Sequence, residues 1–161
     1  MSEWFPVNVG LRQGCVMSPW LFNVYMDEVV REVNVRVLGK GLELLNANGG
    51  RFEINQLLFA DDTALEADSE DEFCRLVSEF GRVCERRKLR VNVGKSKVMR
   101  CSRYGNGDRM HVILNGESLE EVDCFKYLGS QVAADGGCER DVEHRMNEGY
   151  SLGSAKKCPE Q

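Results

Sequence analysis

Apolar residues recur at helical spacing in two segments of the chain, which predicts two long amphipathic helices. The first is expected from about Pro19 to Val37, with Ser18 as its N-cap and Pro19 at the first helical position. The second follows Ser69-Glu70-Asp71-Glu72, a capping box in which Ser69 accepts from the Glu72 amide. Its apolar stripe consists of Phe73, Leu76, Val77, Phe80, Val83 and Cys84. A third helix is expected from about Glu139 to Asn147.

Short apolar runs separated by turn residues predict strands between these helices. Leu42–Leu45 and Arg51–Ile54 flank Asn46-Ala-Asn-Gly-Gly50 and therefore predict a hairpin. The other strand candidates are Trp4–Val9, Val98–Cys101, His111–Leu114 and a pair around Val122–Leu128, with turns at Gly105–Asp108 and Asn115–Gly116. Helices mixed with hairpins indicate an α+β fold.

The stretch from Gln56 to Leu65 places Asp61 and Asp62 next to each other between two apolar runs. Leu57-Leu-Phe-Ala60 is expected to be a buried strand that delivers both acids to a hairpin tip, with Thr63–Ala67 as the return strand. Two carboxylates about 4 Å apart repel by roughly 4 kcal/mol at an effective dielectric constant near 20, and a divalent cation or a proton relieves that repulsion. The spacing alone favours a solvated turn over a metal site, because aspartate is a common turn residue.

The formal net charge of −5 argues against a chain that binds nucleic acid over its whole surface. Basic residues are nevertheless concentrated between residues 82 and 103, where Glu85 is the single acid. They are Arg82, Arg86, Arg87, Lys88, Arg90, Lys95, Lys97, Arg100 and Arg103. This basic stretch predicts either a solvated face or a surface that meets phosphate without sequence specificity.

The composition fits a folded intracellular domain, either cytoplasmic or nuclear. The chain has 161 residues, 42% of them hydrophobic, and only three prolines. No apolar run is as long as a membrane span, and the first residues lack the features of a signal peptide, so we expect neither secretion nor a membrane partner. The seven cysteines form no close pair and are expected to be mostly buried apolar groups rather than disulfides or zinc ligands.

The segment Gly10-Leu-Arg-Gln-Gly14 has glycines at both ends, which suggests a sharply bent backbone that another group can approach closely. It leads into the first predicted helix, whose N-terminus could attract an anion near Arg12 and Gln13. An ordinary loop before a capped helix explains the same residues.

Four ordered boxes resemble the palm region of reverse transcriptases, most closely those of non-LTR (LINE-type) retrotransposons and more distantly those of group II introns. The boxes are Gly10–Gly14 continuing through Ser18–Asn23, Phe59–Asp62, Asn92–Ser96 and Phe125–Gly129, and the likeness covers about Trp4 to Arg145. It implies an α+β polymerase palm fragment, incomplete at both ends, in which an antiparallel sheet carries the catalytic Asp-Asp hairpin and packs on helices. Residues 1–150 would be a partial reverse transcriptase domain, with the thumb starting near 139–150 and a loose tail at 151–161.

The resemblance also implies roles for individual residues. Asp61, Asp62 and Lys95 would be catalytic, and the two aspartates would bind two Mg²⁺ ions, or Mn²⁺, with Asp61 as the main ligand. Arg12, Gln13 and Gly14 would contact the incoming nucleotide. The primer grip would consist of Phe125, Lys126, Tyr127, Leu128 and Gly129. The implied partners are an RNA template, a DNA primer and deoxynucleoside triphosphates.

One departure from the family pattern concerns the first catalytic carboxylate, which lies on a strand upstream of the Gly-Leu-Arg-Gln-Gly box. Before Leu11 this chain has only Glu3 as an acid. We therefore expect apolar surface to be exposed beside Phe59 and Leu65, and we expect the chain alone not to polymerise, with metal binding left open. The alternatives are a non-catalytic remnant, a nucleic-acid-binding or interaction module acting through residues 82–103, and a regulator recruited by a host.

Overall fold

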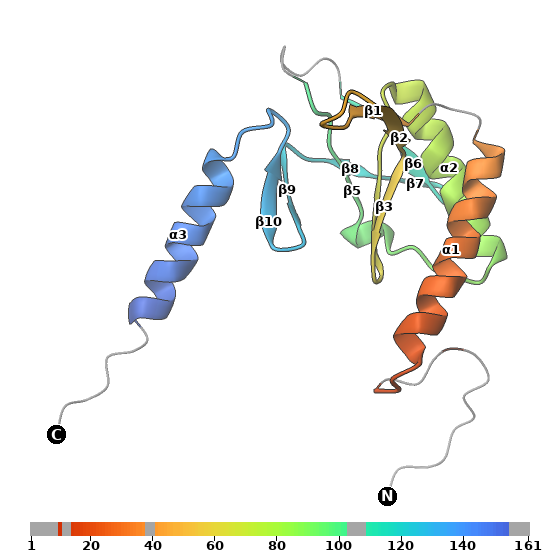
Figure 1. Cartoon of the computed structure of the whole chain (residues 1–161), viewed down its shortest axis with the longest axis horizontal. Coiled ribbons are helices and arrows are strands. Elements are labelled where there is room, and N and C mark those ends of the chain that lie inside the picture. The colour runs from red at the N-terminus through yellow and green to blue at the C-terminus, as the bar shows by residue number, and fades with distance from the viewer. Residues whose placement is uncertain (1–9, 11–13, 38–40, 103–108, 155–161) are drawn as a thin grey trace, which may run out of the picture. The chain divides into compact units, whose positions relative to one another are not determined.

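The computed structural model describes residue 10 and residues 14–37, 41–102 and 109–154, with residues 148–154 described by their backbone (Figure 1). The chain divides into two compact units, Met1–Val91 and Asn92–Gln161, and each is considered by itself. The strand expected at Trp4–Val9, the residues Arg12 and Gln13, the turn at Gly105–Asp108 and the end of the tail at 155–161 lie outside the described residues.

The first unit contains two helices and two antiparallel hairpins. Helix α1 spans Ser18–Arg36 and helix α2 spans Glu70–Arg86. Strands β1 (Leu42–Leu45) and β2 (Arg51–Ile54) form the hairpin that the turn residues predicted, and β3 (Gln56–Phe59) pairs with β4 (Asp62–Leu65). The helices and hairpins expected from the periodicity of this half are therefore confirmed.

The core of the first unit lies between α1 and α2. Its buried members are Val29 and Val33 from α1 and Leu76, Phe80, Val83 and Cys84 from α2. Val37, Leu65, Leu89 and Val91 pack against this cluster, so the end of β4 and the segment after α2 share the same core. The predicted stripe of α2 is confirmed, since all its members are buried except Phe73, which is half-buried.

The two helices begin differently. Ser69 is the N-cap of α2, and its Oγ accepts from the Glu72 amide over 3.3 Å, as the capping box predicted. The prediction of Ser18 as the N-cap of α1 is wrong by one residue. Met17 is the N-cap, because its carbonyl already accepts from the Leu21 amide over 3.0 Å and Ser18 itself is helical.

The second unit consists of short strands followed by a helix. Its elements are the 3-10 helix η1 (Val93–Lys95), β5 (Lys97–Val98), β6 (Ile113–Leu114), β7 (Glu117–Ser118), β8 (Glu120–Glu121), β9 (Cys124–Tyr127), β10 (Ser130–Ala133) and α3 (Glu139–Ser154). Strands β5 and β8 pair in parallel, whereas β6–β7 and β9–β10 are antiparallel. The tight turn at Asn115–Gly116 is confirmed by positive φ values of 51° and 84°. Helix α3 continues past the expected end at Asn147 to Ser154.

The described cysteines do not follow the prediction of general burial. Cys84 is buried in the first core, and burial raises the pKa of its thiol to about 11. Cys15, Cys101 and Cys138 are exposed, and Cys74 and Cys124 are half-buried. The prediction relied on the average burial of cysteine, whereas among the described cysteines only Cys84 lies on the buried side of an amphipathic helix.

None of the helices within the described ranges is long and apolar enough to cross a membrane.

Replacing Leu76 with alanine is expected to destabilise the first unit by about 2–5 kcal/mol, because it leaves a cavity between α1 and α2. Urea denaturation followed by circular dichroism measures this loss. The control is Leu45→Ala in β1, where the side chain is 69% exposed and the change should stay within about 0.5 kcal/mol. Equal losses in the two variants would contradict this location of the core.

Candidate functional site

The β3–β4 hairpin places the two predicted metal ligands at its tip. Phe59 pairs with Asp62, so Ala60 and Asp61 form a two-residue loop and Asp62 is the first residue of β4. Ala60 has a φ of 52°, the positive value that two-residue hairpin loops commonly require. Both aspartates are exposed, so the tip presents two adjacent carboxylates to solvent.

The strand that leads to this tip is not buried, which corrects the prediction. Leu57 and Leu58 are each 39% exposed and Phe59 is 61% exposed. Within the described residues β3 pairs with β4 alone, so its other edge has no neighbouring strand. The expected apolar exposure beside Phe59 is thus observed. At Leu65 the expectation is wrong, because this residue is half-buried and packs against the α1–α2 core.

The opposite end of the hairpin is fixed to the helices. Leu65 contacts the core, and the side chains of Asn55 and Gln56 donate to Asn34 of α1. The Glu66 amide donates to the Asn55 carbonyl over 2.9 Å, which extends the hairpin pairing by one step. The carboxylates therefore lie at the free end of a hairpin whose base is attached to α1 and to the core.

The chemistry of the tip suits a hard divalent cation. Carboxylate oxygens are the ligands that Mg²⁺ and Mn²⁺ prefer, and Mg²⁺ usually takes one or two protein carboxylates with water and phosphate oxygens completing its shell. Asp61 and Asp62 supply two such ligands. In the part of the chain that the structure describes, no group of three or more acidic, histidine or cysteine side chains is placed to hold a metal.

The other predicted catalytic and nucleotide-binding residues lie on separate segments. Lys95 is the last residue of η1 in the second unit, and its side chain is exposed. Asn92 caps this turn, since its Oδ1 accepts from the Lys95 amide over 3.2 Å. Gly14, before α1 in the first unit, is exposed and has a φ of 80°. The positive φ explains why glycine suits this bend.

The five predicted primer-grip residues occupy one hairpin of the second unit. Phe125, Lys126 and Tyr127 belong to β9, and Leu128–Gly129 form the turn to β10, with φ values of 48° and 88°. Helix α3 holds this hairpin from the β10 side. The Gln131 amide donates to Asp141 Oδ1 over 2.7 Å, and Arg145 Nη2 donates to Ser130 Oγ over 2.8 Å. The bond from the Gln131 amide lowers the pKa of the Asp141 carboxyl.

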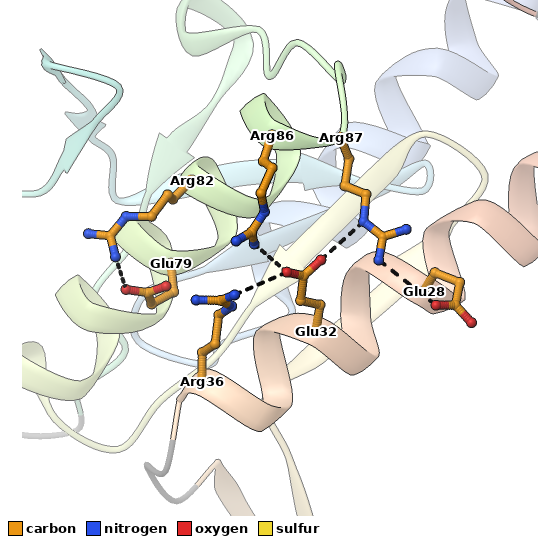
Figure 2. Close-up of polar contacts among 7 residues, drawn as sticks. All are labelled: Glu28, Glu32, Arg36, Glu79, Arg82, Arg86 and Arg87. Carbon is orange, nitrogen blue, oxygen red and sulfur yellow. Dashed lines mark hydrogen bonds and ion pairs between the residues drawn. The ribbon is translucent and has the colours of Figure 1, made fainter.

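Several residues of the basic stretch are paired with glutamates, and most of these partners are remote in sequence. Arg86 at the end of α2 and Arg87, the C-cap of that helix, both contact Glu32 of α1, and Arg82 pairs with Glu79 over 2.7 Å (Figure 2). In the second unit Lys97 pairs with Glu120. The stretch itself also divides between the units after Val91. These residues therefore carry less free positive charge than their sequence suggests.

Glu32 is the structurally important residue that sequence analysis missed. Its Oε2 accepts from Arg87 Nε over 3.0 Å, and its Oε1 accepts from Arg36 Nη2 over 3.2 Å and contacts Arg86 (Figure 2). Partial burial acts to raise the pKa of the Glu32 carboxyl, but the bond from Arg87 and the charges of Arg86 and Arg87 outweigh it, so the net pKa is lowered. The sequence signal was limited to the Glu32–Arg36 spacing of one helical turn.

Comparisons with known proteins identify the kind of chain to which these features belong. The family model described as reverse transcriptase (RNA-dependent DNA polymerase) matches residues 1–132. A Caenorhabditis elegans protein whose name describes it as uncharacterized and transposon-derived is 26% identical over 106 residues, which are 65% of this chain. The aligned part is 38% of that protein, so the chain spans well under half of its relative. No solved structure gives a significant match.

Glu32→Gln is expected to lower stability most at neutral pH. Because the folded-state pKa is lowered, the carboxylate's contribution is fully present above the ordinary pKa of a glutamate carboxyl and is lost as the pH falls through the lowered folded-state pKa. The difference in unfolding free energy between wild type and variant should therefore shrink between about pH 7 and about pH 3. Urea denaturation across this range measures it.

The matched control is Glu28→Gln on the same helix, where the side chain is 55% exposed and lies 3.9 Å from Arg87. Its effect should be smaller than that of Glu32→Gln at neutral pH. Equal losses of unfolding free energy in the two variants would contradict a specific stabilising role of the Glu32 contacts between α1 and the end of α2.

Proposed function

The chain belongs to the reverse transcriptase (RNA-dependent DNA polymerase) family, and we propose that it is the palm portion of a retrotransposon reverse transcriptase. The observation that carries the proposal is the β3–β4 hairpin, which holds Asp61 and Asp62 exposed at its tip. The transposon-derived name of the worm relative supports the retrotransposon origin. The likeness to LINE-type enzymes is part of the same proposal and rests on the sequence boxes.

The proposed reaction is the RNA-templated addition of deoxynucleotides to a primer 3′-hydroxyl, with release of pyrophosphate. Asp61 and Asp62 would bind the two divalent ions, with Asp61 as the main ligand. Bound there, the ions would supply charge neutralisation and activation of the hydroxyl. The exposed tip leaves room around both carboxylates for phosphate oxygens and water.

The remaining roles are assigned from the family boxes. Lys95 would place its ammonium near the triphosphate, where it offsets charge or protonates the leaving group. Arg12, Gln13 and Gly14 would contact the incoming nucleotide, and the exposed Gly14 with its positive φ is compatible with a close approach. The hairpin from Phe125 to Gly129 would place the primer end, and its attachment to α3 through Asp141 supports a rigid element.

We also propose that this chain does not polymerise alone. The two-ion reaction in the family uses a third carboxylate on an upstream strand, and the described residues bring together no third acid with Asp61 and Asp62. The rival function, a nucleic-acid-binding module acting through residues 82–103, has less support. Arg82, Arg86 and Arg87 already pair with glutamates, and phosphate would have to compete for them.

Asp61→Ala is expected to weaken Mn²⁺ binding by the full chain about tenfold or more, because it removes a direct ligand and even supporting residues of metal sites are worth that much. Electron paramagnetic resonance of free Mn²⁺ measures the affinity. Asp68→Ala is the control, since Asp68 is also exposed but lies beyond the end of β4. If both substitutions weaken Mn²⁺ binding equally, the overall negative charge of the protein attracts the ion, and the hairpin tip is not a specific site.

The purified chain is expected to give no Mg²⁺-dependent extension of a DNA primer on an RNA template. Gel analysis of a labelled primer measures this, with an active reverse transcriptase as the positive control. Extension that Asp61→Ala abolishes would contradict the proposed inactivity. The same result would assign catalysis to the hairpin, so it would strengthen the proposal for Asp61 itself.

A further inference from the structure

One side-chain oxygen of α1 receives two hydrogen bonds from the base of the carboxylate hairpin. Asn34 Oδ1 accepts from Asn55 Nδ2 over 3.1 Å and from Gln56 Nε2 over 2.8 Å. Asn55 directly precedes β3, and Gln56 is its first residue. We infer that Asn34 is a positioning residue for Asp61 and Asp62, and the metal-binding part of this inference rests on the function proposed above.

The two bonds complement the apolar contact at the same level of the hairpin. Gln56 pairs with Leu65 across the strands, and Leu65 is the residue that packs against the α1–α2 core. Packing of apolar groups holds the hairpin against the helices but has no preferred direction. Hydrogen bonds are directional, so the bonds to Asn34 restrict how the hairpin is oriented about that contact.

The partial burial of the Gln56 side chain makes its bond to Asn34 more important. Its Oε1 is fully buried and meets no donor among the residues that the structure describes. The Nε2 group of the same amide is paired with Asn34. Loss of Asn34 would thus remove the partner of a carboxamide whose other polar atom is already unsatisfied, and it would weaken the attachment of the hairpin base to α1.

The distance from base to tip amplifies any such shift. The Phe59–Asp62 pair lies three residue steps along the strand from the Gln56–Leu65 pair, which corresponds to about 10 Å. A tilt of about 10° at the base therefore moves the tip by roughly 2 Å. Displacements of this size are large compared with the precision that metal and phosphoryl chemistry requires.

The test compares Asn34→Ala with Asn34→Asp in the full chain. Aspartate keeps an oxygen at the same position that can accept from both amides, whereas alanine removes it. In Asn34→Ala we expect amide hydrogen exchange of β3–β4 to accelerate about tenfold, with the α2 amides unchanged. Asn34→Asp should keep hairpin exchange close to the wild-type rate. Asn23→Ala, at another exposed asparagine of α1, controls for the change in helix propensity.

The second readout is Mn²⁺ affinity, which Asn34→Ala should lower while far-UV circular dichroism stays unchanged. If Asp61→Ala shows that the hairpin binds no Mn²⁺, the proposed function fails, but the exchange data still decide whether Asn34 holds the hairpin. Unchanged exchange in Asn34→Ala, or equal acceleration in α2, would overturn the inference. If Asn34→Ala does not fold, Asn34→Asp decides, and fast exchange of its hairpin would also overturn it.

Discussion

The packing of α1 against α2 is the interaction on which the first unit depends. Val29 and Val33 meet Leu76, Phe80, Val83 and Cys84 in a core that also receives Leu65 at the end of β4. The carboxylate hairpin depends on this core because β3 is largely exposed and the hairpin is anchored at its base, where Leu65 packs against the helices. The Glu32–Arg87 pair lies at the edge of the same helix interface and adds charge pairing to apolar burial (Figure 2).

The features predicted correctly from the sequence are those decided by neighbouring residues. Ser69 caps α2 because its side-chain oxygen lies three residues before the Glu72 amide that it accepts from. The apolar stripe from Leu76 to Cys84 follows from the helical spacing of apolar residues within a short segment. The two acids fall at the hairpin tip for a similar reason, since the turn and its flanking runs are adjacent in the chain. The family resemblance was likewise legible in short ordered boxes, and the family match confirms it.

The features that the sequence did not reveal depend on residues far apart. Glu32 bonds Arg87 across 55 positions, and Asn34 bonds Gln56 across 22, so neither contact has a local pattern. The burial of β3 was predicted wrongly because an apolar run in the sequence does not determine whether another part of the protein packs against it. The N-cap of α1 was missed by one residue because Pro19 was expected at the first helical position, whereas it is the second helical residue, after Ser18.

The left-handed backbone conformation of Ala60 makes the Asp-Asp motif dependent on the rest of the fold. At a φ of 52°, a non-glycine residue has a conformational free energy about 1–2 kcal/mol higher than in a right-handed conformation. An isolated two-stranded hairpin is in any case marginally stable at best. The surrounding helices must supply the stability that the turn lacks. A peptide excised around Phe59-Ala-Asp-Asp62 would therefore keep the signature but lose the shape, and the motif would not function as a portable metal-binding tag.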